Sequence, residues 1–549
     1  MPRLEPRAPA ILASITTLLC GPALALGSVL SAGSSPNRLA DSPNAVSPGG
    51  PPSLSQQVFI KEYRVEGAHK LTKIEIEEAV YPFLGPGRTA EDVERARAAL
   101  EKVYKDKGYQ TVSVQIPPQQ AAGGVVVLQV TETRVGRLLV KGSRYYSLKQ
   151  IKRQTTSLVE GNVPNFNEVT RDIVGLNQLP ERRVTPALRA GVEPGTVDID
   201  LNVADTFPLH GSVELNNRYS PGTTELRLNG SASYNNLWQL EHSIGFSFQL
   251  APERLSDAKV FSAYYLARFP DISWLSLIAQ GTKQDSNIST LGGVGVAGRG
   301  EVVGLRAILT LPGAKEFYHT LTLGFDYKHF NPNLTIAGSE ILTPISYYPL
   351  SVNYNATLAN KGSVTVLNAE VIFGLRGLGS DEAEFDFNRF KAGGSFFYFR
   401  GDLSHTHDLP GGLQLFGKLQ GQAADQPLLN TEQFNGGRLA TARGYLESEA
   451  LGDNAIFGSI ELRSPSLLNV LSEKNEWRFY LFSEGGMLSL EDALPEQESR
   501  FYLASVGIGS RIRFQDHFNG SLDVGVPLVS QTQTKALDLL LTFRVWADF

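Results

Sequence analysis

The chain has 549 residues, 42% of them hydrophobic, and its 50 basic and 56 acidic side chains leave a net charge of −6. It contains no run of about 18 apolar residues, so the sequence excludes a protein that spans a membrane with helices. The mild negative charge provides no basic footprint, which excludes DNA and RNA as partners.

Residues 1–25 are predicted to be a secretory signal peptide. Two arginines precede an apolar segment, and Ala23-Leu24-Ala25 supplies a small-x-small site, so cleavage is expected after about Ala25. The single cysteine, Cys20, lies inside this peptide. The mature chain would therefore have no disulfide, no catalytic thiol and no cysteine metal site. Residues 26–56 are rich in Ser, Pro and Gly and are predicted to be a flexible linker without an amphipathic helix.

Two tandem copies of a small α+β unit are predicted next, over residues 57–134 and 135–206. Both copies show the order strand, helix, helix, strand, strand. The clearest element is an amphipathic helix in TAEDVERARAALEKVYKDKGY, for which Thr89 provides a cap and Gly108 a stop.

From residue 207 to residue 549 the pattern has a period of two, which predicts strands. In HSIGFSFQL the apolar Ile244, Phe246, Phe248 and Leu250 alternate with polar or small residues. Charged residues occupy one face only, so the apolar face is expected to meet lipid and the other a polar lumen. About 340 residues at roughly 20 per strand unit predict a transmembrane barrel of about 16 antiparallel strands. A soluble β-sandwich, the alternative, would need a polar outer face.

The chain closes on a strand whose alternate residues are apolar and which ends in phenylalanine. This ending is typical of outer-membrane barrels, and its candidate signal residues are Phe543, Val545 and Phe549.

A long loop around residues 431–453 interrupts the strand pattern and contains FNGGRLATARGYLESEALGD. Loops of this length are usually functional or disordered. Gly436, Gly437, Gly444 and Gly452 would permit close backbone packing. Arg443 is suited to bind a carboxylate if the loop folds into the lumen, and Glu484 in FYLFSEGGM is the candidate anchor. The alternative is an exposed loop with an ordinary surface arginine.

These motifs resemble those of the Omp85 superfamily, which carries a V/I-R-G-Y/F tip on a lumen-folded sixth extracellular loop and an F-x-D-x-G strand motif that binds it. The match covers Arg443, Gly444 and Tyr445 at the tip and Phe482 and Gly486 on the strand. The sequence departs from the family at Ala442, where Val is usual, and at Glu484, where Asp is usual.

Within that superfamily, KGYQTVSVQIPPQQAAGGVVVLQV resembles the signature of two-partner-secretion transporters of the hemolysin and filamentous-hemagglutinin (ShlB/FhaC/HecB) type. Tyr109, Pro117 or Pro118, Gln119 or Gln120, and Gly124 match, and the resemblance covers roughly residues 57–549. It implies two periplasmic POTRA domains ahead of an outer-membrane barrel, and export of one large exoprotein without ATP. The alternative function is that of an Omp85-type barrel assembly and insertion factor.

The partners implied are a TpsA-like hemolysin or adhesin, outer-membrane lipid and, during biogenesis, the barrel assembly machinery and periplasmic chaperones. A POTRA sheet edge beside a helix can bind an extended substrate by β-augmentation. The candidate substrate-binding residues lie on the helix and edge strand of the first repeat: Val93, Leu100, Tyr104, Tyr109, Val112, Val114 and Ile116.

Other motifs predict no further chemistry. Residues 293–298 match GxGxxG but precede a strand-like segment, where no helix N-terminus would receive a phosphate. His405, His407 and Asp408 are expected at a tight turn through Pro410 and Gly411, so metal binding is not predicted. No catalytic grouping stands out, and we expect neither enzymatic activity nor a cofactor.

Overall fold

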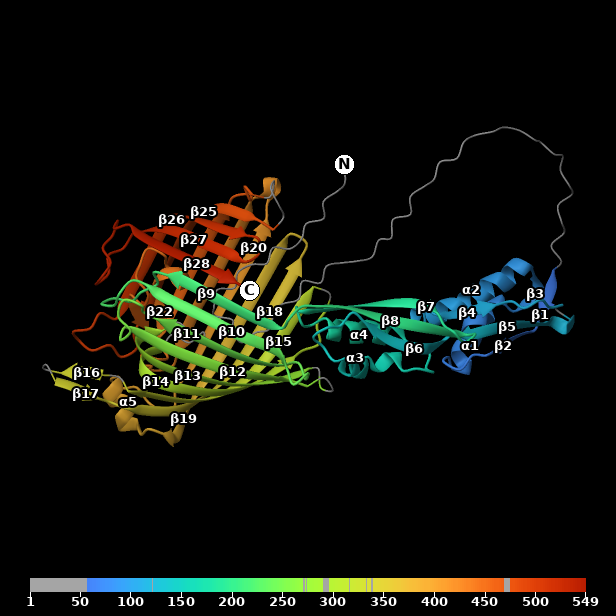
Figure 1. The fold of residues 1–549 in the computed structure, drawn as a ribbon, viewed down its shortest axis with the longest axis horizontal. Coiled ribbons are helices and arrows are strands. Elements are labelled where there is room, and N and C mark those ends of the chain that lie inside the picture. Colours follow the sequence, from blue (N-terminus) through green and yellow to red (C-terminus); the bar gives the residue numbers. More distant parts are fainter. Residues whose placement is uncertain are drawn as a thin grey trace. The chain divides into compact units, whose positions relative to one another are not determined.

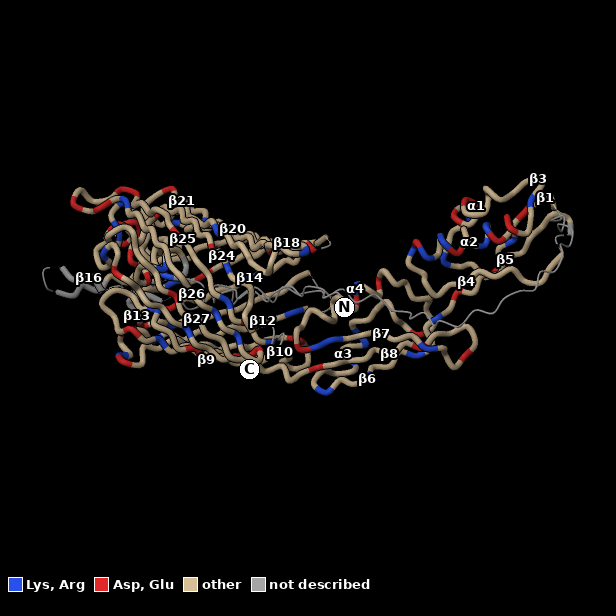
Figure 2. The backbone as a smooth tube through the Cα atoms, turned by 90° about the horizontal axis from the view of Figure 1, so that it is seen from above, with Lys and Arg blue, Asp and Glu red and all other residues tan. Residues whose placement is uncertain are grey.

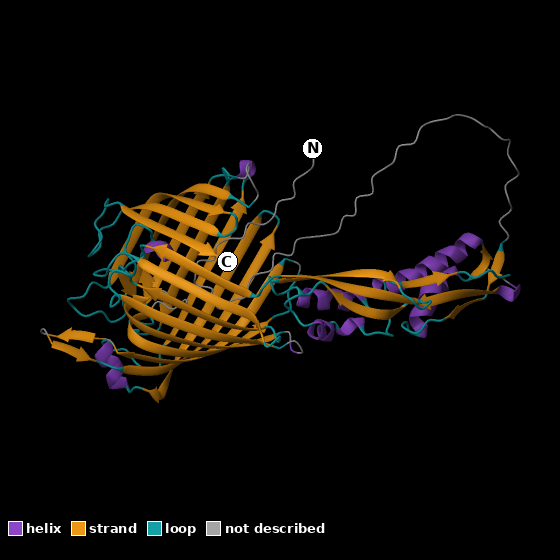
Figure 3. Cartoon of the chain, in the orientation of Figure 1, coloured by secondary structure: helices purple, strands orange, loops and turns teal. Residues whose placement is uncertain are grey.

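The computed structural model describes residues 57–120, 122–269, 272, 274–289, 296–314, 316–331, 333–336, 339–468 and 474–549. The predicted signal peptide and linker lie outside these residues. The chain divides into two compact units, one ending at Phe207 and one running from Pro208 to Phe549. Helices are concentrated in the first unit and strands dominate the second (Figure 3). Among the described residues no helix is long and apolar enough to cross a membrane.

The first repeat is a three-stranded sheet with two helices. Its elements are β1 Val58–Ile60, β2 Glu62–Glu66, α1 Lys73–Val80, β3 Gly85–Arg88, α2 Ala90–Asp106, β4 Val112–Gln115 and β5 Val125–Glu132. The sheet order is β2-β5-β4, with β2 parallel to β5, and a β1–β3 pair that the sequence did not predict stands beside it. Helix α2 begins after Thr89, whose backbone N–H donates to Asp92 (3.0 Å), and Gly108 after it has φ +96°.

The second repeat has the same element order and the same topology. It contains β6 Arg134–Lys141, α3 Leu148–Gln154, α4 Phe166–Leu176, β7 Arg182–Ala190 and β8 Thr196–Asp205, with sheet order β6-β8-β7. A carboxylate at the end of each last strand binds backbone N–H groups of the turn after the first strand. Glu132 accepts from His69 (2.7 Å), and Asp205 accepts from Tyr145 (2.9 Å). The two repeats therefore share this hydrogen-bond arrangement as well as a sheet topology.

The second repeat should lose stability in acid. The nearly covered Asp198 carboxylate accepts a hydrogen bond from Arg137 Nη2 (2.8 Å), and this guanidinium holds the pKa of Asp198 below its usual range. Because the folded pKa is lowered, the stabilisation is complete above about pH 4 and is lost as the pH falls through the folded value. For residues 57–206, we expect circular dichroism to show that Asp198→Asn lowers the melting temperature at about pH 6 and has a smaller effect near pH 3. An equal effect at both pH values would contradict this.

The second unit is a closed barrel of 16 strands, which confirms the predicted fold. The strands follow one another in sequence around the barrel (Figure 1). They are β9 Leu209–Asn216, β10 Arg227–Leu237, β11 His242–Leu250, β12 Ala258–Arg268, β13 Leu275–Ser289, β14 Val296–Thr310, β15 Phe317–Asn331, β18 Ile345–Asn360, β19 Ser363–Gly379, β20 Phe397–Asp408, β21 Gln414–Ala424, β24 Asn454–Arg463, β25 Glu476–Ser489, β26 Arg500–Phe514, β27 Phe518–Pro527 and β28 Leu540–Asp548.

Several short elements lie in the connections between the barrel strands. These are β16 Asn333–Ile336, β17 Ser339–Leu342, α5 Glu382–Asn388, β22 Phe434–Gly436, α6 Arg438–Thr441 and β23 Ala450–Gly452.

The barrel wall alternates as the sequence predicts. On β11 the large apolar Ile244 and Phe246 are exposed, whereas Ser243, Ser247 and Gln249 are buried on the inner face. Long uncharged stretches run along the barrel strands, whereas acidic and basic residues mix along α1 and α2 (Figure 2). An apolar outer face and a polar inner face suit a barrel set in lipid.

The barrel closes between its last strand and its first. β28 pairs with β9 in antiparallel register, Arg544 opposite Asn216 and Asp548 opposite Ser212. Phe549 extends the seam by exchanging backbone hydrogen bonds with Gly211 (2.7 and 2.9 Å). The three predicted signal residues lie on β28 or just after it, where Val545 and Phe549 are exposed and Phe543 is half-buried.

Candidate functional site

The loop with the Arg-Gly-Tyr triplet connects β21 to β24. At the end where β9 finishes, the connections join β9 to β10, β11 to β12, β13 to β14, β15 to β18, β19 to β20 and β21 to β24, so this loop is the sixth. It starts with a two-stranded ribbon in which Phe434 of β22 lies opposite Gly452 of β23. Beyond the ribbon, residues 438–449 form the tip segment.

Arg443 binds Glu484 on the inner wall of β25. Its guanidinium Nη2 and Nε lie 2.6 and 2.9 Å from Glu484 Oε1, and its backbone N–H donates to Oε2 (2.7 Å). Both side chains are buried, at 3% and 4% exposed. The structure thus brings together the two residues that the sequence pairs, with the glutamate supplying both oxygens to one arginine. Paired hydrogen bonds to an ionised group are among the stronger ones in proteins.

Four further charged groups complete the site, and the sequence did not identify them. Arg443 also lies 2.8 Å from Glu461 on β24 and 3.3 Å from Asp523 on β27. Glu461 in turn binds Arg463 (2.7 Å) and Arg511 of β26 (3.3 Å). Three guanidinium groups therefore face three carboxylates, and the cluster is electrically neutral. We call these six residues the latch cluster.

Two aromatic rings form a platform under the arginine. The Arg443 guanidinium lies 3.7 Å from the centre of the Phe482 ring and 5.6 Å from that of Tyr480, at distances that allow cation–π attraction. Tyr480 also donates to Asp523 (2.6 Å). Glycines of β26 leave room for both rings: a Cβ at Gly507 would lie 2.3 Å from Phe482, and one at Gly509 would lie 2.3 Å from Tyr480.

Gly444 and Tyr445 fix the tip against β26 and β27. A Cβ on Gly444 would lie 2.8 Å from the backbone nitrogen of Pro527, and one on Gly525 would lie 2.7 Å from the Arg443 carbonyl oxygen. The two backbones therefore touch where neither residue has a side chain. Tyr445 is fully buried, and its hydroxyl lies within hydrogen-bonding distance of the carbonyl oxygens of Ala504 (3.0 Å) and Val529 (2.8 Å).

The remaining sequence-predicted residues support this packing. Gly436 and Gly452 lie on the ribbon, where a Cβ would meet the Leu488 side chain at 2.7 Å. Gly437 has φ +127°, a backbone conformation that favours glycine. On β25, a Cβ at Gly486 would meet Phe457 at 2.5 Å. Each of these positions allows close contact between the loop or β25 and its neighbour.

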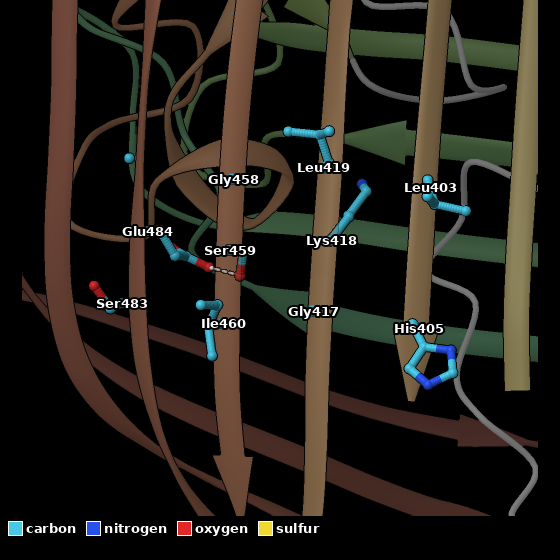
Figure 4. A pocket seen from close by; sticks show the side chains of 11 residues that line it. Leu403, His405, Gly417, Lys418, Leu419, Gly458, Ser459, Ile460, Ser483 and Glu484 are labelled. Atoms are coloured by element: carbon cyan, nitrogen blue, oxygen red, sulfur yellow. Dashed lines mark hydrogen bonds between the residues drawn. The ribbon is translucent and has the colours of Figure 1, made fainter. Parts of the chain in front are cut away.

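The barrel wall behind the latch cluster has a hollow on its outer face, where three neighbouring strands each have a glycine. Figure 4 shows Glu484 joined to Ser459 of β24 by a hydrogen bond (3.1 Å), with Lys418 on the adjacent strand. The hollow drawn there is also lined by Gly417, Gly458 and Gly485, which face outward from three neighbouring strands. The carboxylate that anchors the loop thus lies behind a wall segment whose outer face has one glycine on each of three strands, among apolar side chains such as Leu419 and Ile460.

The candidate substrate-binding side chains of the first repeat belong instead largely to its hydrophobic core. Leu100, Tyr104, Val112 and Val114 are buried there, with Val93 and Tyr109 packed against them, whereas Ile116 is exposed. The four buried side chains are therefore not available to a substrate in this state, and substrate binding at this helix and edge strand stays a prediction. The apolar stripe of α2 and the inner face of β4 pack on one another, as such stripes normally do. The backbone of β4 and the exposed Ile116 side chain remain available, with Val93 and Tyr109 partly exposed.

The free edges of the two sheets differ. On β4 the Val114 carbonyl accepts from Arg97 Nη1 (3.2 Å). On β7 the Asn177 amide bonds both backbone groups of Val184, at 2.6 and 3.0 Å, and the next outward residue, Pro186, has no N–H. An amide paired in this way takes the place of an added strand. The edge of the second repeat is therefore more completely closed than that of the first.

Gln119, one of the signature residues, has a related role. Its amide bonds both backbone groups of Val127 on β5, each at 2.7 Å, where β4 has already ended. A glutamine at this position completes the sheet beyond the end of its edge strand.

The structure also locates the two motifs from which no chemistry was predicted. The first half of the GxGxxG segment lies outside the described residues, and its second half, from Val296, starts strand β14. His405 and His407 lie on strand β20, before the turn at Pro410–Gly412 and not within it. Among the described residues, no group of three or more His, Cys, Asp or Glu could hold a metal ion.

Comparison with known proteins agrees with this arrangement. Residues 195–512, more than half of the chain, match the family "Haemolysin secretion/activation protein ShlB/FhaC/HecB", and residues 58–133 match "POTRA domain, ShlB-type". The outer membrane transporter CdiB of Dickeya dadantii is 22% identical over 396 residues, which cover 69% of this chain and 67% of that protein.

Two solved structures share the fold. CdiB from Escherichia coli superimposes with a TM-score of 0.66 at 20% identity, covering 92% of this chain and 93% of that chain. BamA from Haemophilus ducreyi lacking POTRA domains 1–3 has a TM-score of 0.55 at 13% identity, covering 90% of this chain and 100% of that chain. With its family match, its barrel and its loop, the chain belongs to the haemolysin secretion/activation family ShlB/FhaC/HecB, whose members are outer-membrane transporters and not enzymes.

Proposed function

We propose that this transporter binds one large exoprotein through its first repeat and exports it through the barrel without ATP. The observation that carries the proposal is the latch cluster. It holds a loop inside the lumen through buried but non-covalent contacts, so the resting barrel is filled and can be cleared without breaking the wall. A passive solute pore needs neither this loop nor two repeats ahead of the barrel.

Recognition is proposed to occur on the β4 edge. An extended segment of the exoprotein would add to the sheet through backbone hydrogen bonds, with Arg97 releasing the Val114 carbonyl. Edge strands are normally protected against such pairing, and β7 is protected twice, by the Asn177 side chain that follows α4 and by its own Pro186. The first repeat is thus the better receptor for an added strand.

The free energy for export is proposed to come from the exoprotein itself. A chain that folds outside the cell cannot return through the barrel, so folding of a large domain draws the remainder outward. Folding of one domain releases about 5–15 kcal/mol, which is enough to bias the direction of a diffusing chain.

A secretion assay tests the proposal. The transporter and the large exoprotein encoded beside it would be expressed together in cells that lack both, and the exoprotein would be measured in the medium and in the periplasm. We expect export only with the transporter present. If the exoprotein is exported without it, and outer-membrane barrels in general fail to insert in its absence, the chain is an assembly factor instead.

Photocrosslinking distinguishes the two edges. With p-benzoylphenylalanine at Gln115 of β4, we expect crosslinks to the exoprotein during export, and with the same residue at Leu188 of β7 we expect few or none. Both positions are exposed on edge strands, so they form a matched pair. Crosslinks at Leu188 that equal or exceed those at Gln115 would contradict recognition by the first repeat.

A further inference from the structure

The loop is held in the lumen at two separate places, and only one of them is the latch cluster. The second place lies at the start of the ribbon. Glu432 is almost fully buried and accepts hydrogen bonds from the hydroxyls of Tyr347 and Tyr398, each at 2.6 Å, and from Lys328. These partners come from β18, β20 and β15, whereas the latch cluster lies on β24 to β27.

Asp453 closes the same base from the other limb of the loop. It is fully buried, and its carboxylate accepts from the backbone of Leu428 (2.9 Å), the amide of Gln433 (2.9 Å) and the backbone of Glu491 (2.8 Å). Asp453 therefore ties the two limbs together and to the connection between β25 and β26. The carbonyl of Glu432 additionally accepts from Arg400 (3.0 Å).

The ribbon between base and tip lies flat on the wall. Its glycines, Gly436 and Gly452, both rest on the Leu488 side chain of β25. The chain then turns at Gly437, whose positive φ marks the end of the ribbon. Beyond it, the tip segment contacts the wall through separate side chains: the Arg443 ion pairs, the Tyr445 hydroxyl, Glu447 with Arg218 (3.2 Å) and Glu449 with Thr534 (2.8 Å).

From this division we infer that Glu432 and Asp453 are positioning residues that keep the base and ribbon fixed during transport, while residues 438–449 alone swing about Gly437. Two buried carboxylates and the packed ribbon hold the base to β15, β18, β20, β25 and the connection between β25 and β26. The base therefore remains in place when the tip is released. The tip then returns to the same carboxylates after each passage. This inference rests on the proposed function, since it describes how the exporting lumen is cleared.

Paired cysteines test the division, because the mature chain is predicted to have no cysteine of its own. The base lock is Gly452→Cys with Leu488→Cys, whose Cβ atoms would lie 2.7 Å apart, and the tip lock is Gly444→Cys with Ser505→Cys, at 3.0 Å. A disulfide needs about 3.5–4.5 Å between Cβ atoms, so each lock closes with a small outward shift of the loop. The reduced form of each variant is its own control.

The first measurement is made in planar bilayers with the purified full-length protein and does not depend on any exoprotein. We expect the oxidised tip lock to suppress channel openings at least tenfold and the reductant to restore them. The oxidised base lock should show as many openings as its own reduced form, both by itself and in combination with Arg443→Ala. If the base lock also suppresses openings, the whole loop leaves the lumen, and if neither lock does, the tip does not move. Either result overturns the inference.

Export measured in cells with the same locks should follow the same pattern. If the unmodified transporter exports nothing while the bilayer pattern holds, the proposed function fails and the fixed base stands.

Rescue provides a test of Glu432 itself. Glu432→Gln should reduce the return of the tip and raise the fraction of time that the channel is open, and the oxidised base lock should restore the resting value. A role in folding alone would not be reversed by oxidation, so failure of rescue would remove Glu432 from the positioning set.

Discussion

Arg443→Ala is expected to release the tip segment and to raise the mean conductance of the purified barrel. Removing the arginine leaves three buried carboxylates facing two arginines, and an uncompensated buried charge costs about 3–5 kcal/mol. The barrel has its own ladder of backbone hydrogen bonds, so this cost falls on the docking of the loop and not on the fold. Single-channel recording in planar bilayers measures the effect.

The control for this variant is Arg376→Ala, which removes one arginine from an exposed pair with Glu382. Exposed pairs contribute only about 0–1 kcal/mol, so its conductance should match that of the unmodified protein. Arg443→Lys keeps the charge without the planar fork and should fall between the two. If Arg443→Ala and Arg376→Ala behave alike, the latch cluster does not hold the loop.

The second large effect is expected from a residue that carries no charge and does not belong to the loop. Gly525→Val places a side chain where the Arg443 carbonyl oxygen now lies, because even a Cβ would be 2.7 Å from it. Overpacking of this kind costs about 1–3 kcal/mol, and the loop can escape it by undocking. The variant should therefore reproduce the conductance of Arg443→Ala with all six charged residues of the latch cluster intact.

Gly458→Val is the matched control, because a Cβ at Gly458 meets nothing within 4 Å. Accessibility of the tip to a protease that cleaves after glutamate provides a second measurement, with Glu447 and Glu449 as the expected sites. We expect faster cleavage in Gly525→Val than in Gly458→Val. Equal cleavage, together with unchanged conductance, would show that the wall accommodates valine and that backbone contact at Gly444 is not needed for docking.

The barrel could be predicted from the sequence because its signal is local. Whether Phe246 faces outward depends only on its place in an alternating segment, and the alternation is visible in a single strand. The helix of the first repeat was predictable for the same reason, through its spacing and its cap at Thr89. Such patterns also separate buried from exposed positions, and the helical spacing of Leu100 and Tyr104 agrees with their place in the core.

The site was only partly predictable, because its members meet through strand register. Arg443 and Glu484 could be paired because the arginine lies in a long glycine-rich loop and the glutamate lies in an apolar strand, whereas Glu461 and Asp523 come from two other strands and resemble any inward-facing acid in the sequence. The contacts at the base of the loop are still harder to predict from the sequence, because Glu432 binds Lys328 across 104 positions of the chain. The sequence does contain one signal for the charged residues of the latch cluster. Four successive strands have charged residues at inward-facing positions of the period-two pattern, as in SIELR.

Burial of the latch cluster also sets how the resting transporter responds to salinity. An ion pair at the rim, such as Lys391 with Asp492, is open to the solvent and weakens as dissolved ions accumulate, since the screening length falls from about 30 Å at 0.01 M to about 3 Å at 1 M. The carboxylates around Arg443 are covered by the loop and by aromatic rings, and mobile ions cannot enter between them. The docked state should therefore be equally occupied in fresh water and in brine, so that the salinity of the external medium does not by itself open the barrel.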